Sequence, residues 1–192
     1  MTLPRPKPPF PRMTADEFLA WTEDLPDGER YELVDGEVVA MSPERSVHGL
    51  TKHRVANVLE AAIGAAGLSC WMHPDGMAVR VDARTVYEPD ALVRCGEPLD
   101  DDAIEVLDPV IVVEVVSPSS RSRDHGVKLA DYFRISSLVH YLIVNTKSRK
   151  VVHHRREDAT GVLIATRILA VGATLDLTPP GLHVEVASLF PA

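Results

Sequence analysis

The sequence predicts one domain of mixed α/β (α+β) class, in which helices pack around a single sheet. Residues 110–116 are apolar and mostly β-branched apart from one acid, which is typical of a central strand covered on both faces. Residues 47–66 instead carry apolar side chains at helical spacing. The length of 192 residues suits one sizeable core, and the chain shows neither an internal repeat nor a linker.

The first third of the chain carries four local signals. Residues 1–12 are proline-rich and predict a flexible or extended arm, which leaves residues 13–192 as the domain. Thr14-Ala15-Asp16-Glu17 fits a capping box and predicts a short helix. Asp35-Gly36 lies between two apolar runs and predicts a hairpin turn. The long helix that follows should stop at Gly67.

After Gly67 the pattern changes to strands, interrupted by one further helix over residues 122–135. The expected strands are residues 68–73, 77–81, 86–94, 110–116, 139–144, 150–155, 161–169 and 183–186. The last three form an antiparallel C-terminal extension. The exposed apolar residues of these strands are able to support a homodimer interface.

Charge and cysteine usage limit the partners and the compartment. The net charge of −8 disfavours tight, indiscriminate binding to nucleic acid, which depends mainly on basic contacts to phosphates. No apolar run approaches the roughly 20 residues of a membrane span, and the N-terminus lacks a signal-peptide core. Cys70 and Cys95 form no CxxC pair, so we expect reduced thiols in a cytoplasmic protein that does not bind membranes.

Glu114 is the residue that points to function, because it is a carboxylate inside the predicted central strand. An unpaired buried carboxylate would cost several kcal/mol unless it is protonated, paired or bound to a metal. Asp90 places a second acid on another expected strand, over residues 86–94. Two acids on two core strands predict a divalent metal site, and their oxygen ligands suit Mg²⁺ or Mn²⁺.

The next helix adds three polar residues along one face. Asp124, Lys128 and Tyr132 follow each other at intervals of four residues. Two carboxylates that share a metal, with an ammonium nearby, are typical of phosphodiester hydrolysis. The alternatives remain open: Glu114 and Lys128 as a structural ion pair, Asp124 as a helix N-terminal acid, and Tyr132 as a packed side chain.

A family resemblance rests on several segments of the chain. Glu88-Pro89-Asp90, followed by Glu114 within its valine-rich strand, resembles the core of the PD-(D/E)XK nucleases. Residues 114–132, together with residues 31–43 and His48, are similar to the bacterial Uma-two family of restriction-type endonucleases. The matching segments extend from about Thr14 to Arg155 and so cover most of the chain.

The resemblance implies a restriction-endonuclease-like mixed sheet flanked by helices and an endonuclease acting on DNA. It also implies that Glu32 contributes to the acidic site, although an acid in this strand ordinarily faces solvent. His48 becomes a supporting or phosphate-binding residue, although a histidine at a helix start is often merely exposed. The superfamily lysine would occupy position 116, which is valine, so Lys128 is expected to replace it. The alternative is a non-catalytic binding or assembly protein with a degenerate site.

Overall fold

The computed structural model describes residues 10–26, 28–116, 122–158 and 163–191, with only the backbone described at residues 122–125. Most of the expected arm, residues 1–9, therefore lies outside the described residues. The chain forms two compact units, residues 1–42 with 80–87 and residues 43–79 with 88–192. That residues 13–192 fold as a single domain stays a prediction.

The first unit contains the two local motifs expected near the N-terminus. Helix α1 (Ala15–Glu23) starts with the capping box: Thr14 Oγ1 accepts from the Glu17 N–H, and the Glu17 carboxylate accepts from the Thr14 N–H at 2.8 Å. The hairpin turn at Asp35 and Gly36 has φ angles of 47° and 79° at these residues, as a type I′ turn requires. Both predictions are confirmed.

The strands of the first unit follow the order β2-β1-β5-β4. Their bounds are β1 (Tyr31–Val34), β2 (Glu37–Ala40), β4 (Ala78–Asp82) and β5 (Thr85–Tyr87). The first two residues of β4 belong to the second unit, where they pair in parallel with β7 (Glu105–Val106).

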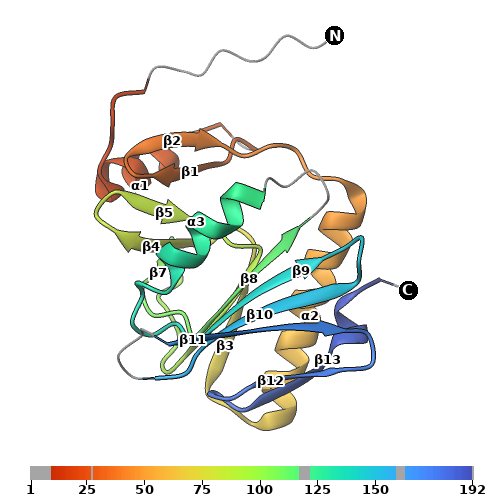
Figure 1. Cartoon of the computed structure of the whole chain (residues 1–192). Coiled ribbons are helices and arrows are strands. Elements are labelled where there is room, and N and C mark those ends of the chain that lie inside the picture. Colours follow the sequence, from red (N-terminus) through yellow and green to blue (C-terminus); the bar gives the residue numbers. More distant parts are fainter. Residues whose placement is uncertain (1–9, 27, 117–121, 159–162, 192) are drawn as a thin grey trace, which may run out of the picture. The chain divides into compact units, whose positions relative to one another are not determined.

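The second unit is built on a six-stranded mixed sheet with the order β11-β10-β9-β8-β6-β3 (Figure 1). The strands are β3 (Cys70–Pro74), β6 (Ala91–Cys95), β8 (Ile111–Val116), β9 (His140–Asn145), β10 (Lys150–Arg156) and β11 (Ile164–Ala170). Neighbouring strands are antiparallel except β8 and β9, which are parallel and are connected through α3 (Ser122–Tyr132). The expected mixed sheet with an antiparallel C-terminal extension is confirmed.

The two faces of this sheet are covered differently (Figure 1). On one face, α2 (Ser46–Ala66) and the hairpin of β12 (Thr174–Leu177) and β13 (Leu182–Glu185) enclose the apolar core together with η1 (Val186–Leu189). Helix α3 contacts the other face, through side chains that reach β8 and β9. Helix α2 ends at Gly67, whose φ of 62° is the left-handed conformation expected of a helix stop.

Three expectations about local structure are wrong. The strand predicted over residues 86–94 is interrupted at Glu88–Asp90, so Asp90 precedes β6 rather than lying within it. Pro89 offers no N–H to a strand ladder, which is consistent with the break. Helix α3 ends at Tyr132 rather than residue 135, and the short strands β7 and β12 were not expected.

The cysteines also differ from the expectation of reduced thiols, because Cys70 and Cys95 form a disulfide. They are directly opposite each other where β3 and β6 pair antiparallel. Their separation of 25 residues gave no sign of this pairing in the sequence. Among the described residues, no helix is both long and apolar enough to cross a membrane.

Candidate active site

Asp90 and Glu114 lie close together in the second unit, Glu114 on the interior strand β8 and Asp90 directly before the neighbouring strand β6. The Asp90 N–H donates to the carbonyl of Val113 at 3.0 Å, directly before β6, whose first residue Ala91 is paired with Val113, so Asp90 lies next to this part of β8. The Asp90 carboxylate is buried and its Oδ2 accepts from the Val115 N–H at 2.6 Å. A backbone hydrogen bond therefore holds this side chain in a defined position.

Glu114 points to the α3 face and meets two side chains of that helix. Lys128 Nζ lies 2.9 Å from Glu114 Oε1, and the Tyr132 hydroxyl donates to the same oxygen at 2.8 Å. One helical turn separates these two partners, so both reach one carboxylate. All three side chains are buried. Glu114 Oε2 has no hydrogen-bond partner among the described residues.

Lys52 is a further buried ammonium that the sequence analysis missed. Its Nζ lies 3.0 Å from Asp90 Oδ1 and 2.5 Å from Glu44 Oε1, and it also pairs with the Asp75 carboxylate. Lys52 follows His48 by one helical turn on α2, and this spacing was the available signal. It could not indicate that α2 faces Asp90, because that depends on tertiary packing.

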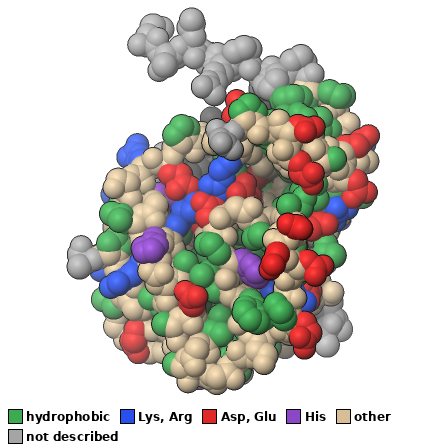
Figure 2. Space-filling view, turned by 180° about the vertical axis from the view of Figure 1, so that it is seen from behind, with side chains coloured by type: hydrophobic (Ala, Val, Ile, Leu, Met, Phe, Trp, Pro, Cys, Tyr) green, Lys and Arg blue, Asp and Glu red, His purple; other side chains and the backbone are tan. Residues whose placement is uncertain are grey.

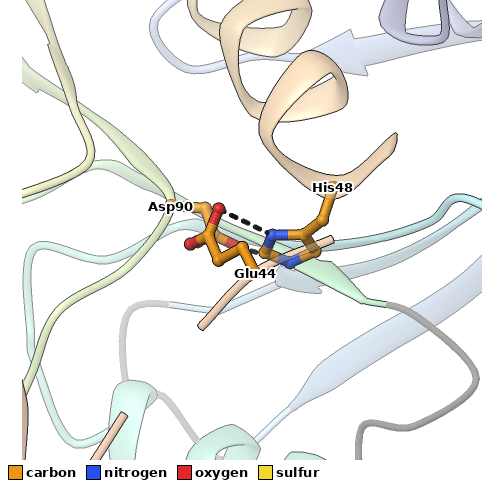
Figure 3. Close-up of side chains that lie close together, drawn as sticks. All are labelled: Glu44, His48 and Asp90. Carbon is orange, nitrogen blue, oxygen red and sulfur yellow. Dashed lines mark ion pairs between the residues drawn. The ribbon is translucent and has the colours of Figure 1, made fainter. Parts of the chain in front are cut away.

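His48 stands between two carboxylates (Figure 3). Its Nε2 contacts the carbonyl of Val115 and lies 3.7 Å from Asp90 Oδ2, while Nδ1 lies 3.2 Å from Glu44 Oε2. Because a carbonyl only accepts, Nε2 carries the proton, and a neutral imidazole then has its lone pair on Nδ1. That buried nitrogen makes no well-aligned hydrogen bond, although Glu44 is near. In the neutral imidazole this lone pair faces the Glu44 carboxylate, so a cation between the two groups would bind both.

The electrostatics of the cluster follow from burial and from neighbouring charges. Burial, together with the Glu114 carboxylate, raises the pKa of Asp90 to about 6, and the Lys52 ammonium opposes this shift. Burial alone would lower the pKa of Lys52, but the carboxylates of Asp90, Asp75 and Glu44 raise it above its ordinary value. Lys52 is therefore a permanent cation within an acidic cluster.

The donor set fits a divalent metal. Glu44, His48 and Asp90 offer ligand atoms that all lie within 4.8 Å of one another. Glu114, beside Asp90, keeps Oε2 free of partners among the described residues. Carboxylate oxygens dominate this set, as Mg²⁺ and Mn²⁺ prefer. The sequence indicated Asp90 and Glu114 as ligands, and the geometry adds Glu44 and His48 as candidates.

The remaining candidates are placed as follows. Position 116, where the superfamily has lysine, is a buried valine on β8. Glu32 lies on β1, which belongs to the first unit. Asp124 lies on α3, but its side chain is outside the described residues.

The sequence is similar to those of known proteins. The profile of the Uma2 family, described as "Putative restriction endonuclease", matches residues 15–187. Two proteins of Synechocystis sp., each named "Uncharacterized protein", are similar to this chain. The first, slr1290, is 27% identical over 162 residues, which is 83% of each chain. The second, sll1609, is 23% identical over 146 residues, covering 75% of this chain and 81% of its own.

A solved structure shows the same fold. It is the crystal structure of a "putative nuclease belonging to DUF820" from Anabaena variabilis. The TM-score is 0.71 over 93% of this chain and 97% of the other, with 15% sequence identity. At this identity the likeness concerns the fold, and it agrees with the nuclease-like architecture expected from the sequence.

Proposed function

Since this chain belongs to the Uma2 family, we propose that it is a metal-dependent endonuclease that hydrolyses DNA phosphodiester bonds. One observation carries the proposal: two acids and an ammonium from three separate segments of the chain, Asp90, Glu114 and Lys128, converge in one buried cluster. Perturbed and coupled titratable groups of this kind are concentrated at functional sites.

In this proposal Asp90 and Glu114 hold Mg²⁺ or Mn²⁺, and His48 and Glu44 are further ligands or hold the ligands in place. A bound divalent cation supplies Lewis-acid polarisation of the phosphoryl oxygen and lowers the pKa of a water molecule. The backbone bond from Val115 to Asp90 Oδ2 restricts the carboxylate to one orientation. A fixed orientation reduces the reorganisation that binding would otherwise require.

Lys128 supplies positive charge where the transferred phosphate gains negative charge. Its ammonium is 2.9 Å from Glu114 Oε1, so it lies beside the acid pair and not between the two carboxylates. The Tyr132 hydroxyl shares that oxygen and keeps Glu114 turned toward α3. Lys128 thereby takes the role of the lysine that Val116 replaces.

Three further assignments complete the proposal. Glu32 assists the acid pair directly or through water, and Asp124 supports the helix that carries Lys128. The protein is cytoplasmic and forms a homodimer, so that two sites act on the two DNA strands. On the face drawn in Figure 2, acidic side chains outnumber basic ones among the described residues, so we infer that DNA binding is selective rather than indiscriminate.

A second function has specific support. Lys52 contacts three carboxylates and so neutralises one of their three negative charges without any metal. With valine at position 116 and a net charge of −8, this favours a binding or assembly protein that retains a degenerate site. In that protein the Glu114–Lys128 contact is a structural ion pair.

Metal binding and cleavage separate the two functions. Calorimetry should show Mn²⁺ binding that weakens at least about tenfold in Asp90→Asn and Glu114→Gln. Glu60→Gln, which removes an exposed acid of α2, should bind as the wild type does. With duplex DNA and Mn²⁺, Lys128→Ala should keep metal binding and lower cleavage by roughly 10²-fold.

The opposite results are equally informative. Equal metal binding by the wild type, Asp90→Asn and Glu114→Gln would defeat the site assignment. Metal binding without cleavage of any nucleic acid tested would favour the non-catalytic protein. Loss of cleavage in Glu32→Gln, with metal binding and fold intact, is the result expected if Glu32 assists catalysis.

A further inference from the structure

A second polar pocket lies in the second unit, between the β10–β11 pair and β12. Its open volume is about 400 Å³, including the part that reaches solvent. The polar residues that line it are His153, Arg155, Glu157, Arg167, Thr174 and Asp176. Nothing in the proposed nuclease function uses these residues.

This pocket lies on the opposite face of the sheet from Glu114. His153 is paired with Leu142, which is paired with Val113, so these three side chains lie on the face that α2 covers. Glu114 follows Val113 in β8 and points to the opposite face, where α3 lies. A ligand in the pocket therefore does not contact Glu114.

Two guanidinium groups of the pocket form no close ion pair with the described residues, although Asp176 attracts Arg155 from a greater distance. The Nε of Arg155 is buried and makes no hydrogen bond, and neither Arg155 nor Arg167 forms an ion pair among the described residues. Leaving a buried donor unsatisfied is costly, and the cost is greater for a charged group. An oxyanion would supply the missing acceptors, because its oxygens match the fork of a guanidinium.

His153 forms an uncharged wall of the pocket. The Nε2 of His140 lies 2.7 Å from the carbonyl of Pro179 and must donate to it, so His140 Nδ1 accepts from His153 Nε2 at 2.8 Å. Burial lowers the pKa of both histidines to about 4. The positive charge of the pocket at neutral pH therefore comes from the two arginines.

The acids of the pocket restrict the size of the ligand. Glu157 and Asp176 are exposed, whereas Arg155 is half-buried. Burial opposes but does not cancel the effect of Thr178, whose hydrogen bond keeps the pKa of Asp176 below its ordinary value, so Asp176 stays charged. A small anion can reach the guanidinium groups past these rim acids. A polyanionic strand would instead be repelled along its length.

We propose that this pocket binds a small phosphate-type oxyanion, either inorganic phosphate or the phosphate of a small monoester, through Arg155 and Arg167. The half-buried guanidinium of Arg155 donates to two oxygens of the anion. Arg167 is opposite His153 in the β10–β11 register and binds the anion from the exposed side. Thr174 lines the pocket from β12, but its hydroxyl already donates to Glu185 Oε1 at 2.7 Å, so the two arginines carry the binding.

The test measures binding in EDTA, so that it is independent of metal and of cleavage. Calorimetry with inorganic phosphate should show binding by the wild type that weakens about tenfold or more in Arg155→Gln and in Arg167→Gln. Lys150→Gln is the matched control, because it removes one exposed positive charge from the same strand. Arg167 is exposed, so its replacement should leave the fold intact even if Arg155→Gln perturbs it.

Imidazole NMR provides a local readout. Phosphate should shift the His153 resonances in the wild type and in Lys150→Gln, but not in the two arginine variants. A mononucleotide and a single-stranded oligonucleotide distinguish the sources: we expect the first to compete with phosphate and the second not to. Competition by the oligonucleotide alone, absence of phosphate binding at tens of millimolar, or equal binding by all four proteins would overturn the proposal.

Discussion

Replacing Lys52 with methionine would remove the ammonium that contacts Asp90, Glu44 and Asp75 while keeping most of the side-chain volume. The change therefore tests charge rather than packing. At 3.0 Å from Asp90 Oδ1 and an effective dielectric constant of about 20, the attraction between the two charges is about 5 kcal/mol. Breaking a buried ion pair by removing one partner typically costs about 3–5 kcal/mol, which agrees with this value.

We therefore expect Lys52→Met to unfold in EDTA with a free energy about 3–5 kcal/mol lower than that of the wild type. For a chain of this length the corresponding fall in Tm is on the order of 10 °C. Part of the deficit should disappear on acidification through pH 6, because the pKa of Asp90 is already about 6 and losing Lys52 raises it further.

Mn²⁺ should raise the unfolding free energy of Lys52→Met more than that of the wild type, because the metal then replaces the missing cation. Urea unfolding in EDTA and in Mn²⁺ measures both effects. Lys150→Met, which removes an exposed lysine of β10, is the control and should change neither. If Lys52→Met is as stable as the wild type in EDTA, the assignment of Lys52 as the compensating charge is refuted.

Three other expectations concern the same fold. Lys128→Met should lower the unfolding free energy of the apo protein by about 3–5 kcal/mol. Glu114→Gln should lower it much less if Glu114 is mainly a metal ligand. A large fall in the unfolding free energy of both variants would indicate a structural ion pair. The pKa values of His140 and His153 are about 4, below the ordinary value of a histidine. The unfolding free energy should therefore fall as the pH drops from about 6.5 to 4, by about 3 kcal/mol per histidine. His153→Gln should make this dependence on pH less steep. Asp90 acts in the opposite direction, because its raised pKa adds stability below pH 6, so the slopes are compared in Asp90→Asn. Changing both cysteines to serine should lower the unfolding free energy by about 3 kcal/mol relative to the oxidised wild type. A reductant should lower the unfolding free energy of the wild type and leave that of the variant unchanged. Equal stability of the two proteins without reductant would contradict this.

Short-range signals determined much of the fold from the sequence alone. The capping box at Thr14, the turn at Asp35 and the stop at Gly67 each depend on neighbouring residues, and the structure contains all three. The buried strand around Glu114 was equally predictable, because its β-branched run leaves little choice of conformation. The acid within that strand is likewise an anomaly that the amino-acid pattern itself reveals.

Tertiary structure alone decided which charged groups meet. Asp90 lies beside Glu114 because β6 and β8 pair antiparallel, and Lys52 reaches Asp90 because α2 packs on that sheet. The break before β6 and the Cys70–Cys95 bond have the same origin, since both depend on the pairing of segments that are distant in the sequence. Such pairings are determined by the burial of all apolar side chains of the core together. The pattern of residues in one segment indicates only which of its side chains share a face.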